Sequence, residues 1–314
     1  MTAPLGAHAA GAARARLALG CALGLALGSA AAASAARGDD GRALTTADGA
    51  PLAWEALVAR ATAARVVYVG EEHGVPAHHA LQRDLLAALD AAGPVALACE
   101  YFPRSLQPAL DRVARGELDL AGFRAAVAWD TTWGHAWEAY APLFELAVAR
   151  RIPVVALNAE RALVQRVRKE GLARLPLEDL LGLPRIDLGV AAHGARVRAQ
   201  LQVVHPLPPE ALERYYQAFT VWDEVMADSV HGALLRDPRP GLRVLVVAGR
   251  AHIEGATGIP DRVSRRFPAP RLVVVCGREL DARHGDVLLH TRPAAPLPPA
   301  APAPPAPEVQ RREY

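Results

Sequence analysis

Two short segments of the chain share the spacing Gly-x-x-His, and each follows a Val-rich run. They are GEEH at residues 70–73 and GRAH at residues 249–252. A glycine at the end of a strand permits a sharp turn, and the histidine after it can point back over the sheet. Glu100 ends a third apolar run. Because two imidazoles and a carboxylate form a common metal-ligand set, the sequence predicts a divalent metal site of His73, Glu100 and His252.

The pattern around these residues predicts an α/β fold with a mostly parallel sheet flanked by helices. Apolar runs typical of strands occur at residues 65–70, 94–100, 153–157, 242–248, 271–276 and 286–290. Helical periodicity lies between them at 76–91, 105–115, 118–128 and 137–150, with a helical insertion or subdomain over about 159–236. Ligands bind at the carboxyl ends of the strands in such sheets, so we expect Asn158, which follows the run at residues 153–157, to join the site.

The ends of the chain differ from this folded part. Residues 1–36 lack acidic side chains and place a short apolar stretch between two arginines and small residues, which is typical of an export signal peptide. Residues 37–50 are expected to be a flexible leader and 51–290 the folded domain. Residues 291–314 are rich in Pro and Ala, which predicts a disordered tail. We therefore expect an exported protein of the periplasm or cell envelope.

The positions of the three cysteines bear on lipid anchoring and on disulfide formation. Cys21 offers a site for lipid anchoring, but only four residues separate it from Arg16, so ordinary signal cleavage is favoured. Cys99 and Cys276 end apolar runs and are expected to be buried thiols, although the sequence leaves a disulfide between them open.

Without residues 1–36 the chain has 33 basic and 33 acidic residues, because its 35 basic residues include Arg14 and Arg16. This balance argues against a nucleic-acid partner.

Three of the five tryptophans, at positions 129, 133 and 137, are spaced to share one face of a helix. They could form an aromatic wall against a flat ligand such as a porphyrin, or a cluster that fixes a loop to the core, which is the commoner role. Further along the chain, Asp223 is a candidate to bond a site histidine and so fix the orientation of its ring. Its neighbour Glu224 is expected to be solvated.

Six segments follow one another in a fixed order: GEEH with His78-His79, ACEYFP at 98–103, WDTTWGHAWEAYAPL at 129–143, ALNA at 156–159, WDEVMA at 222–227 and AGRAH at 248–252. Taken in order, over about residues 45–280, these segments resemble the ChaN family of haem-binding uptake proteins, within the superfamily that includes the Tiki proteases and erythromycin esterases. His135 stands where the family commonly has an aromatic residue. The resemblance implies an envelope protein that binds haem, acts in haem or iron uptake with envelope machinery, and shares haem across a homodimer.

Two functions remain open on the sequence. In the first, haem is bound by the His, Tyr and Trp residues near the strand ends, because haem iron accepts His or Tyr. The candidate haem-binding residues are His78, His79, Tyr101, Trp133, His135, Tyr140 and Asn158. In the second, the protein is a metal-dependent esterase or peptidase in which Glu71 acts as the general base. The sequence has no Ser-nucleophile elbow, P-loop or dinucleotide-binding glycine motif.

Overall fold

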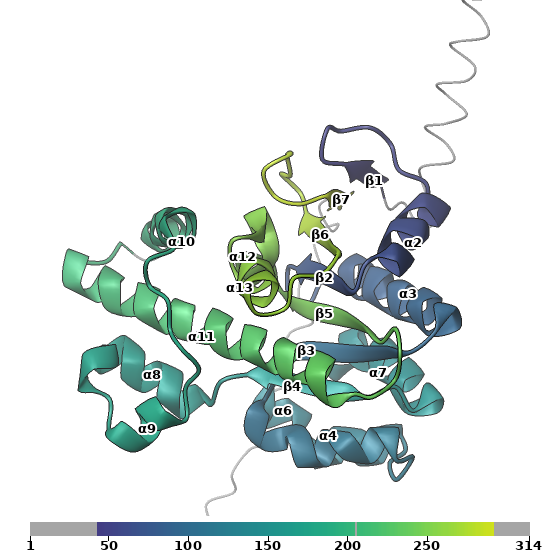
Figure 1. Cartoon of the computed structure of the whole chain (residues 1–314), viewed down its shortest axis with the longest axis horizontal. Coiled ribbons are helices and arrows are strands. Elements are labelled where there is room, and N and C mark those ends of the chain that lie inside the picture. Colours follow the sequence, from purple (N-terminus) through teal and green to yellow (C-terminus); the bar gives the residue numbers. More distant parts are fainter. Residues whose placement is uncertain (1–42, 205, 292–314) are drawn as a thin grey trace, which may run out of the picture.

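The computed structural model describes residues 43–204 and 206–291, which form one α/β unit with a central sheet (Figure 1). Its strands are β1 Ala43–Thr46, β2 Val66–Glu71, β3 Val95–Pro103, β4 Val154–Asn158, β5 Arg243–Gly249, β6 Arg271–Gly277 and β7 Val287–His290. Within the described residues the strand order is β1-β7-β6-β2-β5-β3-β4, and only the β1–β7 pair is antiparallel. The predicted mostly parallel sheet is confirmed.

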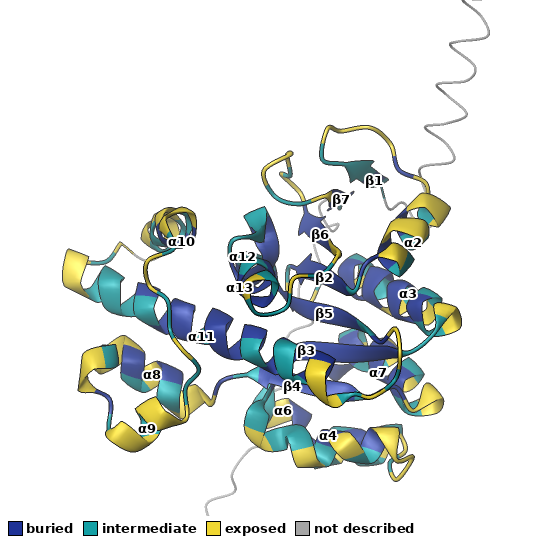
Figure 2. Ribbon diagram, viewed as in Figure 1, coloured by how far each residue is buried: buried dark blue, intermediate teal, exposed yellow. Residues whose placement is uncertain are grey.

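Helices cover both faces of the sheet, as the alternation of strands and helices requires. One face carries α2 Trp54–Ala63, α3 Pro76–Ala92, α4 Gln107–Ala114, α5 Leu120–Ala126, α6 Trp129–Thr132 and α7 Trp137–Arg150. The other carries α11 Pro209–Arg236, α12 Arg250–Ile253 and α13 Ile259–Arg266. Figure 2 shows the strands buried between these layers, which explains why their sequences are continuously apolar.

Alternate residues along a strand pack into two separate hydrophobic cores, one on each face of the sheet. Val67 and Val69 of β2 pack toward α3 and α7, whereas Val66 and Tyr68 pack toward α11 and α13. This is the period-two alternation of a strand that is buried on both faces. The two cores hold the strand ends in fixed positions.

The predicted helical insertion contains α8 Arg161–Glu170, α9 Leu177–Leu181, α10 Ala191–Val204 and the long helix α11. The first part of α11 packs with α8 around a small apolar cluster that includes Val164, Val167 and Val221, while Met226 and Val230 further along α11 pack on the sheet. One element therefore joins the insertion to the sheet. No helix in residues 43–204 or 206–291 has both the length and the apolar character needed to cross a membrane.

The termini require one correction. Residues 43–46, expected to belong to a flexible leader, form the edge strand β1, because Leu44 is buried and the backbone pairs with β7. The predicted signal peptide and Cys21 lie outside the described residues, and so does nearly all of the predicted tail. Cys99 and Cys276 are both buried and free, so no disulfide joins them.

Candidate functional site

The carboxyl ends of β2, β5 and β3 lie side by side and bring the predicted residues together. Glu71 at the end of β2 is in register with Gly249 at the end of β5, and β3 pairs with the other side of β5. His73 and His252 each follow one of these strand ends. The strand-end arrangement inferred from the two Gly-x-x-His segments thus exists in the fold.

Glu71 is the centre of a buried hydrogen-bond network. Its Oε1 lies 2.7 Å from Nδ1 of His73, and its Oε2 accepts a hydrogen bond of 2.8 Å from the Tyr101 hydroxyl. Gln82 also donates to Oε2, and Nδ1 of His79 lies 3.3 Å from it. Burial opposes ionisation, but the hydrogen bonds from His73 and His79 outweigh it and lower the pKa of Glu71 to about 2. Glu71 therefore stays a carboxylate and fixes the His73 ring.

Asp223 is the centre of a second network on the neighbouring side of the site. Its two carboxylate oxygens lie 2.6 Å from Nδ1 of His252 and 2.7 Å from Nε2 of His193. Burial opposes its charge, but His252, His193 and Arg262 hold the pKa of Asp223 well below its usual range. Asp223 orients His252 as the sequence predicted, so each strand-end histidine has its own carboxylate partner.

Glu100 lies between these two histidines. Its Oε2 accepts a hydrogen bond of 2.6 Å from the Gly249 backbone nitrogen, and its Oε1 lies 3.6 Å from Nε2 of His252. A Cβ at position 249 would lie 3.0 Å from Nε2 of His73 and 3.4 Å from Glu100. The glycine is therefore required by space rather than by an unusual backbone angle.

The carboxylates also set the charge of the histidines. Burial alone would lower the pKa of His73, but the hydrogen bond to Glu71 and the charge of Glu100 raise it. The pKa of His252 is likewise raised by Glu100 and Asp223 against the effect of burial. The nearby carboxylates thus favour the protonated form of both imidazoles, against the effect of burial.

The expected divalent metal site is not supported. Among residues 43–204 and 206–291, no group of three or more His, Cys, Asp and Glu side chains is placed to hold a metal ion. Nε2 of His252 lies 3.6 Å from Glu100, which also accepts a hydrogen bond from the Gly249 backbone, so these groups contact one another directly. The same geometry weakens the hydrolase hypothesis, because the proposed base Glu71 is 1% exposed and both of its oxygens are engaged.

A cluster of rings reaches the surface beside His73. The His73 ring centroid lies 4.9 Å from Trp133 and 5.4 Å from His135, and these last two rings are 5.3 Å apart. The side chain of His73 is 31% exposed, and Trp133 and His135 are partly exposed. We call His73, Trp133 and His135 the ring cluster.

The three tryptophans do not share a continuous helix. Helix α6 ends at Thr132, Gly134 has a positive φ of 80°, and α7 begins only at Trp137. The turn separates their roles, because Trp129 and Trp137 are buried in the core and Trp133 faces His73. Trp129 also donates a hydrogen bond of 2.8 Å to the backbone oxygen of His135, which anchors the loop.

The other candidate ligands are buried behind the ring cluster. His78 is bonded to the backbone of Glu72, and the His79 ring packs 4.0 Å from that of Tyr140. The Tyr140 hydroxyl accepts a hydrogen bond of 3.1 Å from the Gly74 nitrogen. Burial is the largest effect that raises the pKa of both Tyr101 and Tyr140. These side chains support the site from the core and do not face an open space.

Asn158 holds the neighbouring strand end. Its Nδ2 donates a hydrogen bond of 2.9 Å to the backbone oxygen of Glu100, whereas its buried Oδ1 has no partner in the described part of the chain. Asn158 therefore fixes the end of β3 and leaves one unused acceptor near the site.

Sequence reasoning missed several contributors. Gln82 could have been found from its position three residues after His79 on the same helix, but His193 lies in the insertion and follows no strand end. Glu224 was expected to be solvated, and this was wrong: it is 1% exposed and forms ion pairs with Arg262 and Arg266. The basic residues that neutralise it are about forty positions away on α13, so no local pattern indicates the pairing.

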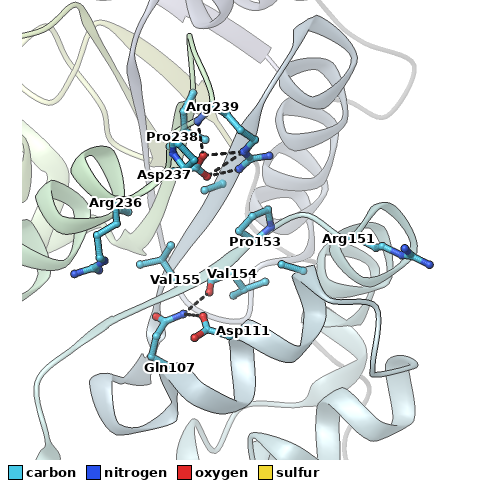
Figure 3. Close-up of a pocket in the computed structure, with 14 residues that line it drawn as sticks. Gln107, Asp111, Arg151, Pro153, Val154, Val155, Arg236, Asp237, Pro238 and Arg239 are labelled. Atoms are coloured by element: carbon cyan, nitrogen blue, oxygen red, sulfur yellow. Dashed lines mark hydrogen bonds and ion pairs between the residues drawn. The ribbon is translucent and has the colours of Figure 1, made fainter.

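A cavity of about 730 Å³ lies at the opposite end of the strands, where β4 begins (Figure 3). Figure 3 shows Gln107 bonded to Asp111 and to the backbone of Val154, and Arg239 paired with Asp237. It is separate from the carboxyl-edge residues described above.

Comparisons with known proteins agree with this fold. The family model described as haem-binding uptake, Tiki superfamily, ChaN matches residues 57–263. A structure described as cofacial heme binding to ChaN of Campylobacter jejuni matches with a TM-score of 0.65 and 19% identity, covering 79% of this chain and 95% of that one. No curated protein sequence matches the chain.

More distant structures show weaker similarity. The type III effector HopBA1 has a TM-score of 0.40 and 14% identity, covering 75% of this chain and 91% of that one. RRSP, a MARTX toxin effector domain from Vibrio vulnificus, has a TM-score of 0.39 and 17% identity, covering 78% and 37%. The family match spans the strands that carry His73, Glu100 and His252. The chain belongs to the ChaN family of haem-binding uptake proteins in the Tiki superfamily.

Proposed function

We propose that this protein is an exported haem-binding protein that takes part in haem or iron uptake, and that haem is held at the ring cluster with His135 as the iron ligand. Family membership supports haem as the ligand. The observation that carries the location is the exposed group of two imidazoles and an indole at the carboxyl edge of the sheet. A flat macrocycle can stack against such rings while an imidazole nitrogen binds its iron.

His135 is the better donor of the two exposed imidazoles. Nδ1 of His73 is bonded to Glu71 and its Nε2 lies close to Gly249, so His73 has less room for an iron atom than His135 has. Burial and the nearby His73 lower the pKa of His135, which keeps its ring neutral near neutral pH. A neutral imidazole is the form that binds iron. His73 and Trp133 would then contact the face or edge of the porphyrin.

The tyrosines fit this role less well. The Tyr101 hydroxyl donates to Glu71, and the Tyr140 hydroxyl accepts from the Gly74 backbone. Either hydroxyl would have to break this hydrogen bond within the protein to reach iron. The donor set of the ring cluster thus favours imidazole ligation.

We further propose that two haems bind face to face between two copies of the chain. The Campylobacter protein is described as binding haem cofacially. The ring cluster is a surface feature rather than an enclosed pocket, so one porphyrin face on it would stay open to a second haem. A homodimer would cover both. Uptake and export are supported by the family and by the signal-like pattern of residues 1–36.

Hemin titration tests the proposal. Binding to the purified protein should shift the Soret band and saturate, and cofacial haems should give a split Soret signal in circular dichroism. His135→Ala should weaken binding by about tenfold or more. His231→Ala, at a half-buried histidine two turns beyond Asp223 on α11, is the matched control and should bind as the wild type does. An unshifted Soret band in the wild type would reject haem binding, and equal affinity in His135→Ala would reject the ligand.

A further inference from the structure

A second cavity of about 400 Å³ lies between α8, α10 and α11. Figure 1 shows α8 and α10 on either side of the first part of α11. The volume falls within the range of about 300–1,000 Å³ that is usual for small-molecule pockets. The cavity shares no lining residue with the ring cluster, so it is a separate feature of the molecule.

The walls of this cavity are mainly apolar and aromatic. Tyr215, Phe219 and Trp222 line it from α11, and Leu201 lines it from α10. The Phe219 ring stacks on the His252 ring with centroids 4.4 Å apart and planes inclined by 16°, so the inner wall of the cavity backs onto the strand-end site. Aromatic walls of this kind favour a flat ring as the ligand.

Two arginines give the cavity a positive charge. Arg161 and Arg168 of α8 line it seven residues apart, which places them about two helical turns apart on one face. Arg168 lies 5.2 Å over the Tyr215 ring, and neither arginine forms an ion pair within the described residues. Among residues 43–204 and 206–291, no acidic side chain lines the cavity.

Other arginines on the same two helices, in contrast, are paired with carboxylates. Arg166 on the same helix is paired with Asp179, and Arg198 on α10 is paired with Glu213. Arg161 and Arg168 are exposed and line an apolar cavity without a counter-ion among the described residues, so they are accessible to a carboxylate supplied by a ligand. A guanidinium binds a carboxylate through two parallel hydrogen bonds.

We infer that this cavity binds a flat, apolar ring system that carries a carboxylate. The aromatic residues of α11 hold the ring, and Arg161 or Arg168 binds the carboxylate. Two sources share this chemistry: a small free aromatic acid, and the propionate-bearing edge of a porphyrin. The inference stands on the cavity and its charges, and does not require haem at the ring cluster.

Calorimetric titration with 2-naphthoate tests the inference. We expect saturable binding with one site per chain, and no comparable binding of the neutral methyl ester. The double variant Arg161→Gln/Arg168→Gln should bind naphthoate at least about tenfold more weakly, because it lacks both charged donors. Leu201→Trp, which fills the cavity without changing its charge, should also weaken binding.

The control is Lys169→Gln, which removes a positive charge from the exposed side of the same helix and should leave naphthoate binding unchanged. His135→Ala should also bind naphthoate normally, so a failed haem proposal would not affect this test. Absence of saturable binding, equal binding of the methyl ester, or wild-type affinity in a folded double variant would overturn the inference. Competition by hemin would identify a porphyrin edge as the source, and simultaneous binding would identify a free acid.

Discussion

The substitution Glu71→Gln tests the electrostatic core of the site. Glu71 accepts hydrogen bonds from several partners and is 1% exposed, so its charge is stabilised only in the folded chain. The lowering of its pKa from 4.5 to about 2 corresponds to about 3 kcal/mol of stability near neutral pH. Glutamine keeps the shape but removes the charge, so we expect a loss of about this size.

The pH dependence of this loss has a defined sign. Because the folded-state pKa of Glu71 is lowered, its contribution is fully present above 4.5 and is lost as the pH falls from 4.5 through about 2. Urea unfolding of the wild type and Glu71→Gln should therefore differ by about 3 kcal/mol near pH 7, and by roughly half of that near pH 3.

Glu145→Gln is the control for this measurement, since Glu145 is an exposed residue of α7 and should change stability by less than about 0.5 kcal/mol. A stability difference for Glu71→Gln that stays constant with pH would refute the electrostatic explanation. A variant as stable as the wild type near pH 7 would show that the buried carboxylate is not held by its partners.

Three further predictions concern the surrounding residues. Asp223→Ala should destabilise the fold by about 3–5 kcal/mol in urea unfolding, because it removes the buried carboxylate that both His252 and His193 bond; a loss below about 1 kcal/mol would contradict the role given to Asp223. Gly249→Ala should weaken hemin binding, because its Cβ would press on His73, at a stability cost of about 1–3 kcal/mol; unchanged Soret titration would show that His73 does not contact haem. Hemin affinity should hold as the pH falls to the ordinary histidine pKa and decline only below it, because the pKa of His135 is lowered; a decline beginning above that value would point to another ligand.

Sequence reasoning recovered the fold and the meeting of the strand ends because both depend on local patterns. Continuous Val-rich runs indicate strands that are buried on both faces of a parallel sheet. Because the carboxyl ends of such strands lie at one edge of the sheet, His73, Glu100 and His252 are expected there, and the strand pairing places them there. Asp223 was recognised as a partner of a histidine, and it binds His252.

What the sequence could not give was the direction in which each side chain points. His73 and His252 both turn their Nδ1 atoms toward carboxylates, so the two histidines expected in one metal site belong to two hydrogen-bonded networks. Gly134 interrupts the helix that the tryptophan spacing suggested, so only Trp133 reaches the surface beside His73. Such outcomes depend on contacts between distant segments, and a single sequence carries no signal for them.

The central claim is that an imidazole of the ring cluster binds haem iron. Magnetic circular dichroism of the ferric complex distinguishes an imidazole ligand from a tyrosinate ligand. We predict an imidazole signature in the wild type that is retained in His231→Ala and lost in His135→Ala. A tyrosinate signature in the wild type, or an imidazole signature that persists in His135→Ala, would contradict the claim.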